Sequence, residues 1–274
     1  MIPLILVGAS GRMGRAVEAA ALEAGGFRIK ARFSRSEPLS REGPGSGEAG
    51  YGLERPGAGQ SSVRDALLRC AVQGDVIVDF SRPEACRDTA RACAERGAAL
   101  VTGTTGLGPE DERALAEAAR RAAVLRAANF SLGIVALRRA VAAALRALPE
   151  DWDIEIVERH HRRKVDSPSG TALLIADEVA GHRGGSEVSR RSGREGAAGP
   201  RPRDEIGIHS VRGGTWVGDH AVLLAGTGES LEIRHVAEDR SAFAHGALRA
   251  ARFVASAPPG LYALEDVLSS PGRG

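Results

Sequence analysis

Residues 2–17 read IPLILVGASGRMGRAV, and this stretch decides the fold expected for the first half of the chain. An apolar run over residues 2–7 ends in a glycine loop, GASGRMG at residues 8–14, and residues 12–24 have helical composition. Glycines spaced three and three allow a tight turn, close approach of backbone to a pyrophosphate and close packing of helix on strand. Taken alone, such glycines fit a plain turn equally well, but the preceding strand favours a dinucleotide site.

The alternation of strand and helix continues through the first half of the chain. The sequence predicts strands at residues 27–33, 75–80, 98–102 and 124–128. It predicts helices at residues 63–70, 83–96 and 110–122. Residues 36–60 are rich in Gly, Pro, Ser and Glu without periodicity, which predicts a surface loop. Alternating units of this length favour a Rossmann-type, doubly wound parallel sheet covered on both faces.

The pattern changes in the second half. Here the sequence predicts helices at residues 133–148, from Thr171 onward and at 240–256. It predicts strands at residues 153–159, 206–211, 216–224 and 231–237. Residues 182–203 are predicted to form a loop that is mobile without ligand. Three strands in succession without a helix indicate an α+β domain with a mixed or antiparallel sheet. We therefore expect a first domain over residues 1–129, to which residues 240–274 return, and a second domain over residues 130–239.

Composition gives no support to several classes of function. A formal net charge of +2 over 274 residues, and basic clusters without interleaved aromatics, argue against nucleic-acid binding. Cys70, Cys86 and Cys93 are too few and too irregular for a disulfide framework or a metal site, and the last two have the spacing of packed helical residues. No run of about 18 apolar residues suggests a membrane span, so we expect a cytoplasmic protein.

The stretch richest in chemistry is ERHHRRKVDSPSGTA, residues 158–172. Five nitrogen-bearing side chains at residues 160–164 precede a Pro-Ser-Gly-Thr turn, where Ser169 or Thr171 can cap a helix. A helix N-terminus beside cations favours an anion, such as a carboxylate. His160 can donate a proton near neutral pH. The segment predicts an enzyme that acts on a small acidic molecule.

The end of the second strand should contact the adenosine ribose, where an acidic residue would favour NAD. This chain has Arg32-Phe-Ser-Arg-Ser at residues 32–36 instead, and a guanidinium suits a 2′-phosphate. NADPH is therefore the preferred cofactor, with NADH not excluded, although an arginine on a solvated strand end remains the alternative. Two loops at carboxyl ends of predicted strands, GTTG at residues 103–106 and AANFSLG at 127–133, could line a nicotinamide or simply cap helices.

Together with DFSRPEA at residues 79–85 and GLYALEDVL at 260–268, these motifs occur in an order that resembles the 4-hydroxy-tetrahydrodipicolinate (dihydrodipicolinate) reductase family. The resemblance spans nearly the whole chain, and the histidine–lysine segment is its most specific part. It implies a two-domain, NAD(P)H-dependent reductase of bacterial diaminopimelate and lysine biosynthesis. The expected substrate is a cyclic imine dicarboxylate, reduced to tetrahydrodipicolinate. The family is usually a homotetramer joined through the sheets of the second domain.

The resemblance also assigns roles to residues. His160 matches the proton donor and Lys164 its partner in catalysis, and no metal is implied. Substrate contacts are expected at His161, Ser169, Gly170 and Thr171. Cofactor contacts are expected at Gly8, Ala9, Ser10, Gly11, Arg12, Met13, Arg35, Gly103, Thr104, Thr105, Ala127, Ala128, Asn129 and Phe130. Many members have an acidic residue where this chain has Ser34, which puts efficient use of NADH in doubt.

Three alternatives remain beside this interpretation. One is an aspartate-type or a semialdehyde dehydrogenase of similar architecture, but the latter needs a cysteine nucleophile in the second domain and this chain has none beyond Cys93. Another is a sensor that binds NADPH without catalysis, for which the His160 and Lys164 pair has no use. The third, nucleic-acid binding, conflicts with the near-neutral charge.

Overall fold

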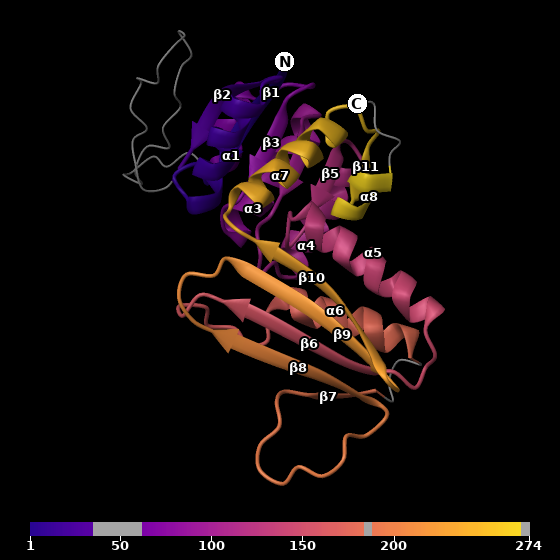
Figure 1. The fold of residues 1–274 in the computed structure, drawn as a ribbon. Coiled ribbons are helices and arrows are strands. Elements are labelled where there is room, and N and C mark those ends of the chain that lie inside the picture. Colours follow the sequence, from indigo (N-terminus) through magenta and orange to yellow (C-terminus); the bar gives the residue numbers. More distant parts are fainter. Residues whose placement is uncertain (35–61, 184–187, 270–274) are drawn as a thin grey trace. The chain divides into compact units, whose positions relative to one another are not determined.

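The computed structural model describes residues 1–34, 62–183 and 188–269, and it divides into two compact units that are treated separately below (Figure 1). The first unit comprises Met1–Phe130 and Arg240–Gly274, and the second comprises Ser131–Asp239. The predicted loop at residues 36–60 lies outside the described residues. Within the described part of the chain, no helix has the length and apolar character needed to cross a membrane.

The first unit is a doubly wound parallel sheet, as predicted. Its six strands lie in the order β11 (Gly260–Tyr262), β5 (Ala123–Arg126), β4 (Ala99–Thr102), β3 (Val76–Asp79), β1 (Ile2–Val7) and β2 (Phe27–Phe33), all parallel. Its helices are α1 (Arg12–Ala24), α2 (Val63–Cys70), α3 (Pro83–Arg96), α4 (Pro109–Ala119), α7 (Ser241–Val254) and α8 (Leu264–Ser269). Helices α2, α3 and α4 pack side by side, and α1 packs on α7, so the sheet is covered on both faces.

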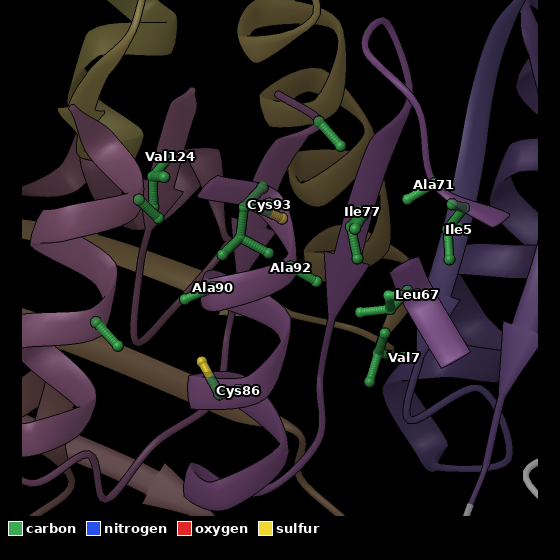
Figure 2. Close-up of a cluster of buried hydrophobic side chains, with 14 of the residues drawn as sticks. Ile5, Val7, Leu67, Ala71, Ile77, Cys86, Ala90, Ala92, Cys93 and Val124 are labelled. Carbon is green, nitrogen blue, oxygen red and sulfur yellow. The ribbon is translucent and has the colours of Figure 1, made fainter. Parts of the chain in front are cut away.

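The core between the sheet and α2–α4 explains why these segments fold as they do (Figure 2). Helix α3 begins with Pro83 in its first turn and ends at Gly97, whose left-handed φ of 66° closes the helix. Cys86 and Cys93 are fully buried on the sheet-facing side of α3. Burial raises the pKa of the Cys86 thiol to about 12, so it packs as an apolar residue, as its spacing predicted.

The second unit is a mixed sheet with helices on one face. Its strands lie in the order β10 (Glu229–Ala237), β9 (Gly218–Gly226), β6 (Asp153–His160), β8 (Glu205–Arg212) and β7 (Ser189–Arg191). Strand β9 is antiparallel to both of its neighbours, β10 and β6, whereas β8 is parallel to both of its neighbours, β6 and β7. Helices α5 (Leu132–Ala147) and α6 (Gly170–His182) cover one face, where apolar residues of β6, β8 and β9 form the core.

The structure corrects the predicted loop at residues 182–203. Part of it, β7, pairs with β8, and two arginines bind carboxylates of the sheet. Arg201 pairs with Asp153 at 2.7 Å and with Glu155 at 2.9 Å, and Arg194 contacts Glu155 at 3.2 Å. Residues 192–203 are neither helix nor strand, as predicted, but the composition gave no sign of β7 or of these contacts with the sheet.

Candidate active site

The glycine loop joins β1 to α1 with the backbone geometry that a pyrophosphate needs. Gly8 has a left-handed φ of 80°, and a side chain there would collide with the backbone at Phe80. A side chain at Gly14 would collide with the backbone of Gly8 and Ala9, so the helix lies tight against the loop. Helix α1 begins after Gly11 with no side-chain cap among the described residues, which leaves its first N–H groups for an anion. These features fit a dinucleotide phosphate.

Phe80, which follows β3, connects the three loops predicted to contact the cofactor. Its N–H donates to the carbonyl of Val7 at 3.0 Å, and its ring meets that of Phe130 edge-on with centroids 5.3 Å apart. The same ring lies directly against the backbone of Gly103. Because β1, β3, β4 and β5 are parallel neighbours, their carboxyl ends share one edge of the sheet. The loops therefore meet around Phe80, which the sequence analysis included in a motif but not in the site.

Within the Gly103–Thr105 loop, the two threonines have different environments. Thr104 is buried, and its hydroxyl accepts from the N–H of Ser81 at 3.2 Å, so it shapes the loop. Thr105 is exposed and can face a ligand. Asp79 also accepts from the N–H of Ser81, at 2.9 Å. Burial raises the pKa of Asp79 to about 6 against the opposing effect of the Ser81 hydrogen bonds.

Ser34 directly follows β2 and has a hydroxyl group where an NAD-binding site would have a carboxylate. It is buried and hydrogen-bonded to the hydroxyl of Ser10 in the glycine loop. Arg15 supports the same loop, because its Nε donates to the carbonyl of Ser10 at 2.9 Å. Arg32 is paired with Glu18 of α1 at 2.7 Å and is therefore engaged within the protein. Arg35, the predicted 2′-phosphate ligand, lies outside the described residues.

The basic segment begins at the end of β6, and its side chains separate by environment. Alternate residues of β6 are buried on the helix-covered face, and His160 is the last of them, 8% exposed. His161 is half-buried, whereas Arg162 and Arg163 are both exposed. The structure thus separates the buried His160 from the two exposed arginines.

A fully buried carboxylate, Glu158, lies beside His160 on the same face of β6. It accepts from Nδ1 of His160 at 2.6 Å and from two nitrogens of Arg212, each at 2.7 Å. The N–H of Ser169 donates to it at 3.0 Å. His220 lies edge-on to His160 with centroids 5.1 Å apart, and its Nε2 is 3.1 Å from the Ser169 hydroxyl. This set of side chains forms one hydrogen-bonded network.

The electrostatics of this network follow from its burial. Burial opposes ionisation of Glu158, but the hydrogen bonds from Arg212 and His160 outweigh it and lower its pKa to about 2. Burial also lowers the pKa of His160, against the raising effect of Glu158 and with the lowering effect of Lys164. Burial, reinforced by His160, lowers the pKa of His220 to about 4, so His220 is neutral at pH 7. The network therefore pairs an ionised carboxylate with an imidazole that titrates below its usual range.

Lys164 is paired with Asp166, its Nζ lying 2.8 Å from both carboxylate oxygens. Asp166 is 61% exposed, and ion pairs of this kind contribute little because water competes for both charges. A ligand carboxylate can therefore exchange with Asp166 at Lys164. Asp166 also orders its loop, since its carbonyl accepts from Arg212 at 2.7 Å.

The start of α6 corrects one detail of the predicted anion site. Ser169 caps the helix, as expected, with its hydroxyl accepting from the N–H of Ala172 at 3.2 Å. Its own N–H is directed to Glu158, so it is not a donor for a ligand in this structure. Gly170 is exposed and supplies the first N–H of the helix, and Thr171 follows half-buried. Ser169 therefore contacts the carboxylate beside His160, and Gly170 and Thr171 are the first two residues of the helix.

The remaining histidines of the sheet have partners within the unit. His235 lies 3.1 Å from the hydroxyl of Ser131, and His209 lies 2.6 Å from Glu155. Across residues 1–34, 62–183 and 188–269, no group of three or more His, Cys, Asp or Glu side chains could hold a metal ion. Glu158, Arg212 and His220 are the members of the site that sequence analysis did not assign. Only Glu158 had a local signal, its position two residues before His160 on a strand.

Family models match both halves of the chain: the N-terminal model of dihydrodipicolinate reductase over residues 2–130 and the C-terminal model over residues 133–268. Proteins named 4-hydroxy-tetrahydrodipicolinate reductase from Nitrosospira multiformis and Myxococcus xanthus are 44% and 40% identical, over 97% and 98% of each chain. A solved dipicolinate-bound dihydrodipicolinate reductase from Paenisporosarcina sp. TG-14 is 25% identical, covers 97% of this chain and 99% of its own, and has a TM-score of 0.76. A diaminopimelate dehydrogenase from C. glutamicum, 14% identical with a TM-score of 0.55 over 99% and 96% of the two chains, shares the fold. The chain belongs to the dihydrodipicolinate reductase family.

Proposed function

We propose that this protein is a pyridine-nucleotide-dependent reductase that converts 4-hydroxy-tetrahydrodipicolinate to tetrahydrodipicolinate in diaminopimelate and lysine biosynthesis. Membership of the family supports the reaction. The observation that carries the proposal is the buried His160–Glu158–Arg212 network beside Lys164 and the start of α6. In this proposal the network supports the proton donor, and Lys164 with the start of α6 supplies the groups that bind a carboxylate.

His160 is the proton donor of this mechanism. Loss of the 4-hydroxyl group of the substrate as water leaves a ring with a conjugated C=C–C=N system, to which the reduced nicotinamide, when bound, would supply a hydride. The negative charge that then accumulates on the ring nitrogen and on the ring carbon next to the carbon that accepted the hydride requires a proton. The imidazolium form of His160 delivers it from Nε2, because Nδ1–H donates to Glu158, and the ring is left as the neutral Nδ1–H tautomer. A positioned acid of this kind contributes about 10²- to 10⁴-fold to the rate.

Lys164 and the start of α6 bind one substrate carboxylate. Nζ of Lys164 exchanges Asp166 for the substrate, and the N–H groups of Gly170 and Thr171 lie at the positive end of the helix. His161, half-buried next to His160, completes the predicted substrate contacts. Fixing the carboxylate orients the ring relative to the donor, and the lysine also stabilises the charge that develops.

NADPH is the preferred cofactor in this proposal, with NADH as a second substrate. The glycine loop fits the pyrophosphate, and the loops around Phe80 would hold the nicotinamide. At the end of β2 a neutral Ser34 hydroxyl replaces a carboxylate that would repel a 2′-phosphate. Arg35 is the cation proposed to bind that phosphate, and Arg12, which is exposed, is a further cofactor contact in the glycine loop.

The first unit, with the segment from residue 240 onward, is proposed to bind the dinucleotide, and the second to bind substrate and form a homotetramer. The face of the second sheet opposite α5 and α6 is not covered by a described helix of that unit. It carries Val211 and Val236, which are exposed, and surface of this kind is available to another subunit. The predicted cytoplasmic location stays a prediction.

The test is turnover of purified enzyme with substrate made in situ from pyruvate and aspartate semialdehyde by the preceding synthase. We expect oxidation of NADPH at 340 nm that depends on both precursors, with a lower kcat/KM for NADH. Ser34→Asp should reverse this preference by about 10-fold or more, because one repulsive charge beside a phosphate costs over 1.4 kcal/mol. Light scattering coupled to size-exclusion chromatography measures the oligomer.

Ser34→Ala is the matched control, because it removes the bond to Ser10 without adding a charge. It should leave the ratio of NADPH to NADH use nearly unchanged. Cofactor binding without turnover would contradict the reductase assignment and favour the sensor. Equal use of both cofactors by the wild type would contradict the preference for NADPH but leave the reaction intact.

A further inference from the structure

The contacts of Glu158 are those of a residue that fixes the tautomer of a neighbouring histidine, His160. Glu158 has no exposed surface, lies on the helix-covered face of β6, and receives hydrogen bonds from His160, Arg212 and Ser169. We propose that Glu158 is a positioning residue for the reaction: it holds His160 in the Nδ1–H tautomer, so that Nε2 is the nitrogen presented to the substrate, and Arg212 keeps Glu158 ionised and in place. This inference rests on the proposed function for the role of His160.

The tautomer follows from the contacts of the two imidazole nitrogens. A carboxylate only accepts hydrogen bonds, so the 2.6 Å contact requires a proton on Nδ1 of His160. No described residue hydrogen-bonds Nε2. Gly218 is the neighbour of this nitrogen on β9, and a Cβ at that position would only reach van der Waals contact with Nε2, at 3.4 Å. Nδ1 is therefore directed into the protein and Nε2 toward a ligand.

Arg212 makes an ionised Glu158 tolerable in a buried position. Its two terminal nitrogens contact both carboxylate oxygens at 2.7 Å, which is the bidentate geometry of strong guanidinium–carboxylate pairs. The pairing comes from the parallel register of β6 and β8, in which His160 lies opposite Arg212. A buried carboxylate without such a partner would take up a proton instead, and would lose its orienting charge.

Other charged groups near His160 have to be included in any pH effect. Lys164 of the following loop and Arg212 of β8 both disfavour the imidazolium, and Glu158 favours it. His220 of β9 faces the ring edge-on, and Ser169 at the start of α6 contributes a neutral hydroxyl and N–H. Glu158 is thus the carboxylate that offsets two cations at this imidazole. Removing its charge should make His160 a weaker base.

The experiment compares wild type, Glu158→Gln and Glu158→Asp. In the first variant we expect kcat to fall about 10- to 100-fold, as for other partners that orient an imidazole. The alkaline limb of the kcat–pH profile, where the donor loses its proton, should move about one unit lower, because a lost charge pair of about 1.4 kcal/mol corresponds to one pKa unit. Glu158→Asp keeps the charge and should return the limb to the wild-type position.

A second measurement does not depend on turnover. Long-range ¹H–¹⁵N correlation spectra of ¹⁵N-histidine-labelled enzyme report which ring nitrogen is protonated, with His160→Gln used to assign the signal. We expect the Nδ1–H tautomer in the wild type and an increased Nε2–H population in Glu158→Gln. Failure of the proposed function would appear as absent wild-type turnover, whereas the spectra would still judge the role of Glu158.

The matched control is Glu155→Gln on the opposite face of β6, where Glu155 also bonds a histidine at 2.6 Å and two arginines. Its pH limb should stay at the wild-type position. An Nε2–H tautomer of His160 in the wild type overturns the proposal without any variant. A Glu158→Gln enzyme whose kcat falls equally at every pH, or whose limb and tautomer match the wild type, also overturns it.

Discussion

The central strand of the second unit carries a cluster of glutamate, histidine and arginine on each of its faces, and only one of them has the properties of an active site. The inner cluster, Glu158, His160 and Arg212, lies under α6; the outer cluster, Glu155, His209 and Arg201, lies on the uncovered face. The histidine–carboxylate distance is 2.6 Å in both. The Glu158 side chain has no exposed surface, whereas that of Glu155 is 23% exposed. The two clusters therefore have the same residue types and the same histidine–carboxylate distance, and they differ in how deeply the glutamate is buried.

The largest difference between the clusters should appear when each histidine is replaced. His160→Gln removes the proton donor and should lower kcat about 10²- to 10⁴-fold with KM changed only a few-fold. His209→Gln, the matched change on the outer cluster, should alter kcat less than about threefold. Steady-state kinetics at pH 7 measure both. A small effect of His160→Gln would remove His160 from the mechanism, and the two clusters would then not differ in their contribution to catalysis.

Acid should distinguish the two carboxylates by stability. The pKa of Glu158 in the folded state is lowered from 4.5 to about 2, so its contribution is present above pH 4.5 and is lost as pH falls toward 2. The full contribution is about 3 kcal/mol at 1.36 kcal/mol per pKa unit, as an order of magnitude. Urea unfolding followed by fluorescence of Trp152, in the core of this unit, should show wild type and Glu158→Gln converging between pH 6 and pH 3. If the difference in unfolding free energy between wild type and Glu158→Gln stayed constant with pH, the charge of Glu158 would not be the cause of that difference.

A third, smaller effect is expected one step outward from the inner cluster, at Lys164. Lys164→Ala removes the cation that binds the substrate carboxylate and should lower kcat/KM about 10- to 100-fold through both kcat and KM. Its partner Asp166 is exposed, so the unfolding free energy should change by less than about 1 kcal/mol. Kinetics and urea unfolding of the same preparation separate the two effects. Unchanged kinetics would remove Lys164 from the proposal.

The smallest effect is expected for the outer carboxylate. Glu155 is partly exposed and lies in an ion-pair network with Arg194 and Arg201, and such contacts contribute about 1 kcal/mol or less. Glu155→Gln should therefore shift the urea midpoint slightly at pH 7, with kcat nearly constant. Strong inactivation by this variant would show that the uncovered face contributes to catalysis, and the distinction between the clusters would fail.

Local patterns were sufficient for most of the fold. The bounds of β1, α1, β2, α2 and α3 agree with those predicted, because each apolar period ends at a glycine, a proline or a polar break. Strands β7 and β11 were missed, because three residues are too short to show a period and both are held by pairing with a distant strand. Helix α8 was also missed; it has only six residues.

The site shows the same limit. His160 and Lys164 stand out in a short basic segment, and Glu158 lies two residues before His160, where strand periodicity places it on the same face. Arg212 is 54 positions from Glu158 and is brought there by strand register, which no local pattern encodes. The N–H of Ser169 donates to Glu158, and nothing in the sequence indicated this contact because the two residues are brought together by folding.

The side chains of β6 point alternately to the two faces of the sheet, and this limits which insertions or deletions the strand can accept. Strand β6 is hydrogen-bonded to β8 on one side and to β9 on the other, so both neighbouring strands fix its register. One residue gained or lost before Glu158 would turn every later side chain to the opposite face. The proton donor would then lie on the uncovered surface and the outer side chains under α6. Substitutions can adjust the two faces independently, but a single-codon length change in this strand would exchange them together.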